Sequence, residues 1–223
     1  MISAFYKNKH SLNRCEDTLT AAVFDLLKYL PYDLFWKIIK SSLYHQKLPS
    51  ECGEIEEIVF WDHWDPTDTP NSRHVEPDVF IRTRDFDLII EAKRYDEKQQ
   101  GRGQIQNEIQ AYLNEYEEGN KKLYFIQLGG LHNLNDEVDE EVAGVRVPIL
   151  KTDWTKLLYS ISSERKVISQ INYPQMNAYK RIFDDIILVL EIHGFYNINW
   201  LNTLNSKRRN IGNNFNFYEY ARQ

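Results

Sequence analysis

Hydrophobic residues recur at two different spacings along the chain, and the spacing separates predicted helices from predicted strands. Leu19, Val23, Leu26 and Leu30 fall three or four positions apart, which predicts an amphipathic helix over residues 14 to 30. Similar spacing predicts further helices at about 33 to 43, 103 to 118, 154 to 161 and 175 to 193. Short apolar runs bounded by polar and turn residues predict strands at 54 to 64, 75 to 83, 87 to 94, 121 to 130 and 144 to 152.

The order of these elements predicts an α/β protein. Helices precede a group of three strands, and a helix, two more strands and further helices follow. The 121 to 130 strand has a continuous apolar centre, as expected when both faces of a sheet are covered. We therefore expect a mixed central sheet flanked by helices. No internal repeat or long linker divides the 223 residues, so residues 1 to 223 are expected to form a single domain.

Composition and charge narrow the possible classes of protein. The net charge of −6 argues against a protein that coats nucleic acid without specificity, although a local basic groove stays compatible with it. No apolar run approaches the ~18 residues of a membrane span, so no membrane partner is expected. Cys15 and Cys52 cannot make a disulfide framework, which favours a cytoplasmic protein. The acidic run DEVDEE, residues 136 to 141, is expected to be a solvated loop.

Charged residues cluster at one end of the hairpin predicted over residues 75 to 94. Asp78 precedes the first apolar run of this hairpin, and Glu91 and Lys93 follow the second. With the turn near residues 84 and 85, Asp78 and Glu91 lie equally far from it and should face each other, with Cβ atoms about 4.5–5.5 Å apart. Lys93 lies two residues beyond Glu91 and should project from the same face.

Two facing carboxylates and a lysine are suited to metal-assisted phosphate chemistry. Carboxylates this close repel each other unless a cation lies between them, and Mg²⁺ prefers oxygen ligands of this kind. The metal can polarise a phosphoryl oxygen and acidify a bound water, while the lysine orients that water or offsets charge in the transition state. The alternative is that these charges form a surface ion pair at the strand ends, which contributes little.

The arrangement resembles the PD-(D/E)xK nuclease superfamily, whose motif is matched by Pro77-Asp78 and Glu91-Ala92-Lys93. The resemblance implies a restriction-endonuclease-like core over about residues 14 to 160, with a C-terminal helical and tail extension over about 161 to 223. It also implies that Asp78 and Glu91 bind Mg²⁺, with Mn²⁺ as a substitute, and that Lys93 is the catalytic lysine. Acidic-x-Lys also occurs at Asp96 to Lys98 and at Glu164 to Lys166, but only Glu91 to Lys93 directly follows an apolar strand-like run.

The same resemblance suggests two further site residues. Many members carry a metal-binding glutamate on the first helix, which Glu16 matches, and a glutamine on the helix after the lysine strand, which Gln104 matches best, with Gln106 next. Each has an alternative. Glu16 also fits a capping box with Asn13, and Gln104 also fits a solvated residue of the first helical turn. The Q-x-x-x-Y pattern of the branch that resembles RecB and Cas4 nucleases is not matched, because Glu108 precedes Tyr112 by four.

These residues predict a Mg²⁺-dependent nuclease acting on phosphodiester bonds in DNA. Arg94, Lys98 and Arg102 follow the lysine strand and could contact a phosphate backbone. Restriction, phage defence, mobile-element or repair roles all suit such an enzyme, and double-strand cutting with one site per chain would suggest a homodimer. The alternative is a catalytically silent subunit of the same fold that binds nucleic acid or protein. His63 and His74 lie near the hairpin, but no G-x-S-x-G elbow indicates a Ser-His-Asp hydrolase.

Overall fold

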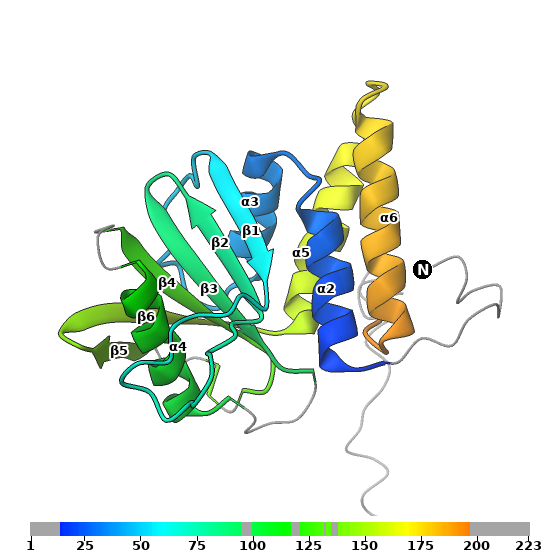
Figure 1. The fold of residues 1–223 in the computed structure, drawn as a ribbon. Helices are drawn as coiled ribbons and strands as arrows, with labels where there is room; N and C mark the ends of the chain where they lie inside the picture. Colours follow the sequence, from blue (N-terminus) through cyan, green and yellow to red (C-terminus); the bar gives the residue numbers. More distant parts are fainter. Residues whose placement is uncertain (1–13, 95–99, 117–120, 132, 135–137, 197–223) are drawn as a thin grey trace, which may run out of the picture.

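The computed structural model describes residues 14–94, 100–116, 121–131, 133–134 and 138–196, and these residues form one α/β unit (Figure 1). Asn13, Lys98 and almost all of the C-terminal tail lie outside the described residues. The described strands are β1 (Ile55–Phe60), β2 (Val79–Thr83), β3 (Phe86–Ala92), β4 (Lys122–Leu128), β5 (Val138–Val142) and β6 (Val145–Thr152). The described helices are α2 (Glu16–Leu27), α3 (Tyr32–Ser42), α4 (Arg102–Glu115), α5 (Trp154–Ser169) and α6 (Met176–Ile192).

The strands form one mixed sheet in the order β1-β2-β3-β4-β6-β5. β1, β2 and β3 form an antiparallel meander, and β4 joins β3 in parallel through the crossover that contains α4. β6 continues the parallel part, and β5 closes that edge antiparallel to β6. β3 and β4 therefore lie at the centre of the sheet, which explains why every residue of β3 is buried.

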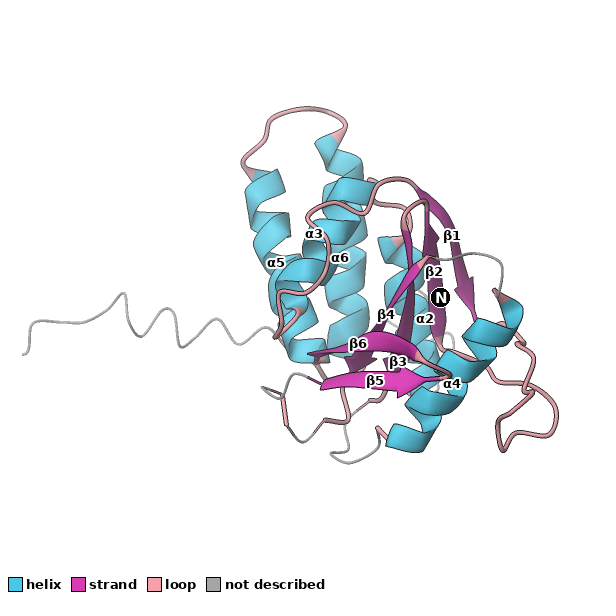
Figure 2. Ribbon diagram, turned by 90° about the vertical axis from the view of Figure 1, so that its left-hand side faces the viewer, coloured by secondary structure: helices cyan, strands magenta, loops and turns pink. Residues whose placement is uncertain are grey.

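Helices cover both faces of the sheet, as Figures 1 and 2 show. On one face, α2, α3, α5 and α6 share a single apolar cluster with alternate residues of the strands, such as Ile81, Leu88 and Ile126. On the other face, α4 packs through Ile105 and Ile109 against the residues of opposite alternation. This period-two division is what an α/β sheet with covered faces requires. The expected α/β class with a mixed sheet flanked by helices is confirmed.

One strand boundary and one loop expected from the sequence are wrong. The strand expected over residues 54 to 64 ends at Phe60, because Trp61 takes a left-handed conformation with φ of 49° that leaves the β region. The acidic run expected to be a solvated loop instead contributes the edge strand β5. Two of its charges have cations nearby, because Asp139 pairs with Lys47 and Arg146, and Glu140 pairs with Arg102.

The helices of the described residues are too short or too polar to cross a bilayer. α5 and α6, which include residues beyond the expected nuclease core, pack against each other, and α6 also packs on α2. Phe183 and Ile186 of α6 belong to the same apolar cluster as Leu19 and Val23 of α2. The C-terminal helices therefore help to fix the position of α2, whose first residue, Glu16, reaches the candidate site.

Candidate active site

The register of the β2–β3 hairpin sets the positions of the predicted carboxylates. Val79 pairs with Ile90, and Phe80 pairs with Ile89. Extending this register by one residue places Asp78 opposite Glu91. Asp78 lies two residues before Phe80 and Glu91 two residues after Ile89, and both apolar residues face α4. Asp78 and Glu91 therefore lie on the same face of the sheet, as the sequence predicted.

Asp78 is held by two hydrogen bonds and is only 8% exposed. The Trp61 indole Nε1 donates to its Oδ1 at 3.1 Å, and the Ala92 backbone N–H donates to its Oδ2 at 2.8 Å. Burial, followed by the charge of Glu91, raises the pKa of Asp78 to about 7, although both hydrogen bonds oppose the shift. The neighbouring carboxylate of Glu91 therefore adds to the rise in the pKa of Asp78 that burial causes.

Lys93 links Glu91 to Glu16. Its ammonium donates to Glu91 Oε1 and, at 3.2 Å, to Glu16 Oε1. Burial alone would lower the pKa of Lys93, but the charges of Glu91, Asp78 and Glu16 together raise it above its ordinary value. Lys93 is therefore a fixed cation at neutral pH.

Glu16 belongs to this cluster and does not act as the expected capping partner. It is the first residue of α2, whose N-cap is Cys15, and Thr18 is the N3 partner, with its Oγ accepting from the Cys15 backbone N–H at 3.2 Å. The second oxygen of Glu16 accepts from the Arg94 backbone N–H at 3.0 Å. The capping alternative for Glu16 is wrong because the helix begins later than its pattern suggested.

The backbone around Lys93 continues the central sheet past the end of β3. The Lys93 N–H donates to the Leu128 carbonyl at 2.7 Å, and its own carbonyl accepts from the Trp154 indole at 2.9 Å. Gly129 lies against the same carbonyl with φ of +78°, and a Cβ there would lie 2.1 Å from the Lys93 oxygen. Only glycine fits this position, so the path of the chain beside Lys93 depends on it.

α4 contributes two side chains that contact Glu91. Gln104 Nε2 donates to Glu91 Oε1 at 2.5 Å, so the predicted glutamine does reach the site. One turn later, Glu108 is 1% exposed and shares a hydrogen bond with Glu91. Burial and then Glu91 raise the pKa of Glu108 well above its ordinary value, and its Oε2 has no hydrogen-bond partner.

Sequence reasoning missed Glu108 and Trp61 as parts of this cluster. Glu108 could have been found, because it lies three residues after Ile105 and four before Tyr112, in the middle of the buried stripe of α4. A carboxyl at such a position is rarely buried without a partner. Trp61 gave no comparable signal, since its contact with Asp78 depends on the turn that ends β1.

Arg94 and Arg102, two of the residues predicted to contact DNA, have different hydrogen-bond partners in the structure. Arg94 donates to the His193 carbonyl at 3.1 Å, toward the end of α6. Arg102 keeps 75% of its side chain exposed while its Nε lies 2.8 Å from Glu140. Gln106, the second choice for the site glutamine, also bonds Glu140, at 3.3 Å, rather than Glu91. Gln104 is therefore the α4 glutamine that the structure brings to Glu91.

The donor chemistry of the cluster suits a divalent cation. Asp78, Glu91 and Glu108 are all buried, and the Lys93 ammonium bonds Glu91 among them. A hard cation with oxygen ligands would relieve this excess of negative charge. Within the described residues, only His63, His74 and Glu76 bring three potential ligand atoms within 4.8 Å of one another. Asp78 and Glu91 would therefore hold such a cation as a pair of carboxylates, with Glu16 reaching it after a movement of its side chain.

Comparison with known proteins finds a relative in Pasteurella multocida (strain Pm70), named "Uncharacterized protein PM0110". The two sequences are 30% identical over 207 residues, which cover 88% of this chain and 76% of that protein. No family model matches the chain, and no solved structure matches it significantly.

Proposed function

This chain belongs to the same family as the uncharacterized protein PM0110 of Pasteurella multocida, and we propose that it is a metal-dependent nuclease that hydrolyses phosphodiester bonds in DNA. The observation that carries the proposal is the grouping of Asp78, Glu91, Lys93 and Glu16 at the end of the central strand β3. The order of the strands and helices around this point is compatible with the restriction-endonuclease-like fold that the motif suggests.

The proposed cofactor is Mg²⁺, with Mn²⁺ as a substitute. Asp78 and Glu91 would hold it, and Glu16 would complete the ligand set. When bound, such a cation acts as a Lewis acid on a phosphate oxygen and acidifies the attacking water. The water oxygen bonds to phosphorus as the bond from phosphorus to the sugar oxygen breaks, in line with the attack. The proton of the water passes to bulk solvent, and the leaving sugar oxygen takes up a proton from solvent.

The other residues of the cluster hold these groups in place. The Lys93 ammonium, fixed by two carboxylates, offsets the negative charge that develops on phosphate and donates a hydrogen bond to the water. Its raised pKa supports a role as a permanent cation rather than as a proton acceptor. Gln104 orients Glu91, and Trp61 orients Asp78.

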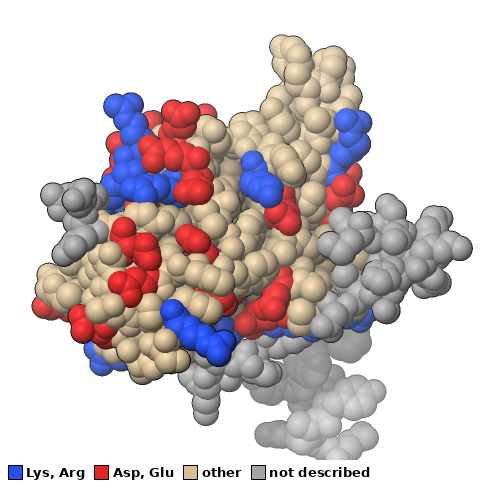
Figure 3. Space-filling view, viewed as in Figure 1, with Lys and Arg blue, Asp and Glu red and all other residues tan. Residues whose placement is uncertain are grey.

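Contacts with DNA would be local rather than spread over the protein. On the face shown in Figure 3, lysine and arginine side chains form small separate groups among acidic ones and do not make a continuous basic stripe. The exposed side chain of Arg102, on the first turn of α4 near Gln104, is placed to meet a phosphate if DNA replaces Glu140 as its partner.

The proposal is tested by incubating the purified chain with plasmid and linear DNA in the presence of Mg²⁺, Mn²⁺ or a chelator. We expect cleavage that requires the metal and is lost in Lys93→Met, because methionine keeps the apolar stem without the ammonium. Lys166→Met is the matched control: it alters the acidic-x-Lys sequence on α5, where Lys166 is exposed, and should cleave like the unaltered chain.

Two results would contradict the proposal. Full cleavage by a folded Lys93→Met variant would remove the lysine from the mechanism. Tight DNA binding by the unaltered chain without metal-dependent cleavage of any substrate would instead favour the binding subunit of the same fold. Thermal unfolding of each variant confirms that a loss of cleavage is not a loss of structure.

A further inference from the structure

A second cluster of metal-ligand side chains lies on the loop between β1 and β2, outside the carboxylate site. Trp64 and Val75 form an isolated antiparallel bridge in this loop, with N–H to carbonyl hydrogen bonds of 3.0 and 3.1 Å in both directions. Both side chains are buried in the α4-side cluster that also contains Phe80. Since side chains alternate along an extended chain, the residues beside the bridge must point outward.

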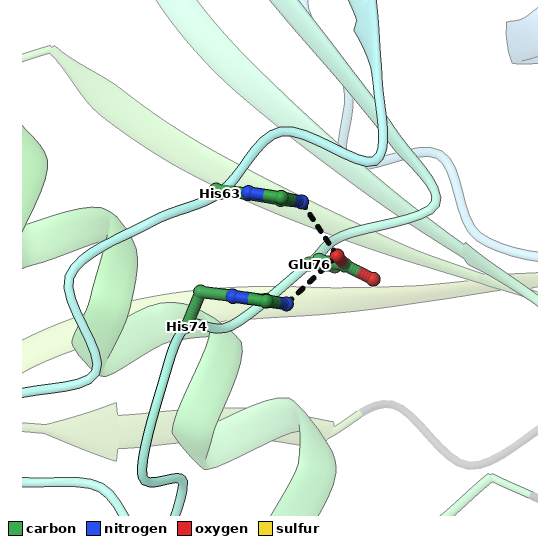
Figure 4. A group of neighbouring side chains, drawn as sticks. All are labelled: His63, His74 and Glu76. Carbon is green, nitrogen blue, oxygen red and sulfur yellow. Dashed lines mark ion pairs between the residues drawn. The ribbon is translucent and has the colours of Figure 1, made fainter.

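His63, His74 and Glu76 are these outward residues. His63 and Glu76 each adjoin the bridged pair and so face one another across the two segments, while His74 lies two residues before Glu76 on the same side. Figure 4 shows the imidazoles of His63 and His74 both directed at the carboxylate of Glu76. The pairing of the backbone at Trp64 and Val75 therefore places the three side chains on the same side of the loop.

The ligand atoms already meet at one carboxylate oxygen. Nε2 of His63 lies 2.7 Å and Nε2 of His74 lies 2.8 Å from Glu76 Oε1. The two imidazoles stack with centroids 4.0 Å apart and planes within 3° of parallel. Both Nε2 atoms point toward Glu76, and binding of one metal ion between the three groups would require the two rings to rotate apart. At least 36% of each of the three side chains is exposed, so solvent reaches all three ligand groups.

The donor set selects a class of metal. Two imidazole nitrogens and one carboxylate oxygen are typical ligands of Zn²⁺, which takes four ligands and can keep water at an open position. Mg²⁺ prefers an all-oxygen shell and competes poorly for imidazole. An exposed ion pair of this kind stabilises the fold only slightly, which leaves the convergence of three ligand atoms without a strong structural reason.

We propose that His63, His74 and Glu76 bind one Zn²⁺ ion on the outer side of the β1–β2 loop. Zn²⁺ binds the neutral form of each imidazole through Nε2, with the ring proton on Nδ1, so protonation of the rings competes with the metal and binding weakens at acidic pH. The loop also carries Trp61 and Asp78 at its ends, and Zn²⁺ would therefore stiffen the segment that presents Asp78. This proposal does not depend on the nuclease proposal.

Calorimetric titration of the metal-free full chain with Zn²⁺, in excess Mg²⁺ that occupies carboxylate sites and without DNA, tests the inference. We expect one Zn²⁺ per chain, bound at least about tenfold more weakly in His63→Ala, His74→Ala and Glu76→Gln. Glu57→Gln, which neutralises an exposed carboxylate on β1, is the matched control and should bind like the unaltered chain.

Two outcomes would overturn the site: no Zn²⁺ binding, or equal affinity and stoichiometry in the unaltered chain and His74→Ala. Titration with Co²⁺ gives a second readout, since its visible absorption reports nitrogen and oxygen ligands directly. The absorption should appear with the unaltered chain and with Glu57→Gln, and be lost in His74→Ala. Because His63, Glu76 and Glu57 are exposed and His74 is half-buried at the surface, circular dichroism should show the same fold for each variant.

Discussion

Glu16 is the residue through which the first helix enters the candidate site. It accepts hydrogen bonds from the Lys93 ammonium and the Arg94 backbone, and neither bond is needed to begin α2, where Thr18 is the N3 partner of the N-cap. We therefore expect the proposed cleavage and the stability of the fold to depend on Glu16 to different extents. A substitution that keeps its shape and removes its charge should separate the two.

We expect Glu16→Gln to reduce Mg²⁺-dependent cleavage at least about tenfold and to change the free energy of unfolding by less than about 1 kcal/mol. The amide oxygen can still accept from Arg94, but it carries no charge to hold Lys93 or a cation. Cleavage kinetics and chemical denaturation measure the two effects. Asp17→Asn, one residue away and exposed, is the control. Equal activity of Glu16→Gln and Asp17→Asn would exclude Glu16 from the site.

Gly129 is the residue on which the backbone beside Lys93 depends. Gly129 and Gly144 both have φ of +78°, but only Gly129 would place a Cβ against another part of the chain, 2.1 Å from the Lys93 carbonyl. Gly144→Ala should cost about 1 kcal/mol of stability from backbone strain alone. Gly129→Ala should cost clearly more and also lower cleavage, as denaturation and activity assays would show. Similar costs for both variants would contradict this account.

At the scale of elements, the β2–β3 hairpin was predictable because the residues that determine it are close together in the sequence. Two apolar runs flank a short polar turn, and the distance of each residue from the turn determines its partner, which is why Asp78 was correctly placed opposite Glu91. β5 was not predictable in this way. Its residues are mostly acidic, and they form a strand only because β6 supplies backbone partners and cations such as Lys47 and Arg102 lie nearby.

The same distinction holds for the parts of the site. Asp78, Glu91 and Lys93 follow from one hairpin and the two-residue period of a strand. Glu16 and Gln104 were suggested by resemblance, and their contacts with Lys93 and Glu91 depend on how α2 and α4 pack. The contact between Trp61 and Asp78 requires the left-handed turn at Trp61, which no local pattern indicated.

α4 provides a test of whether its contact with Glu91 matters for function. Gln104→Met keeps the length of the side chain and removes the Nε2 donor, so Glu91 loses a hydrogen bond of the charged kind, worth about 1.5–3 kcal/mol. We expect single-turnover cleavage to fall by about tenfold or more while the helix stays folded. Gln110→Met, on the same helix but bonded to Asn114, is the control. Unchanged cleavage in Gln104→Met would show that Glu91 needs no orientation from α4.

At the scale of the whole molecule, the end of α6 is joined to the strand that carries Lys93. Arg94 follows Lys93 directly and donates to the carbonyl of His193, the residue that caps α6. His193 is 1% exposed. Its burial, followed by the charges of Arg94 and Arg14, lowers its pKa to about 4. The docking of α6 beside the site therefore requires a neutral imidazole.

This requirement predicts how stability depends on pH. The folded pKa of His193 lies below the unfolded value of 6.5, so between pH 6.5 and pH 4 the unfolded chain binds the additional proton. Acidification through this range should therefore lower the free energy of unfolding, by up to about 3 kcal/mol from His193 alone. Asp78 and Glu108 act in the opposite direction because their pKa values are raised. Only a comparison with a His193 variant isolates the effect.

We expect His193→Gln to lose stability less steeply than the unaltered chain as the pH falls from 6.5 to 4. Denaturant unfolding at several pH values measures the difference between the two profiles. In Arg94→Met one of the two cations that lower the pKa of His193 is gone, so NMR titration of the His193 ring should show that pKa moving up toward its ordinary value. Parallel stability profiles, or a His193 ring that titrates near 6.5 in the unaltered chain, would contradict the link between α6 and the Lys93 strand.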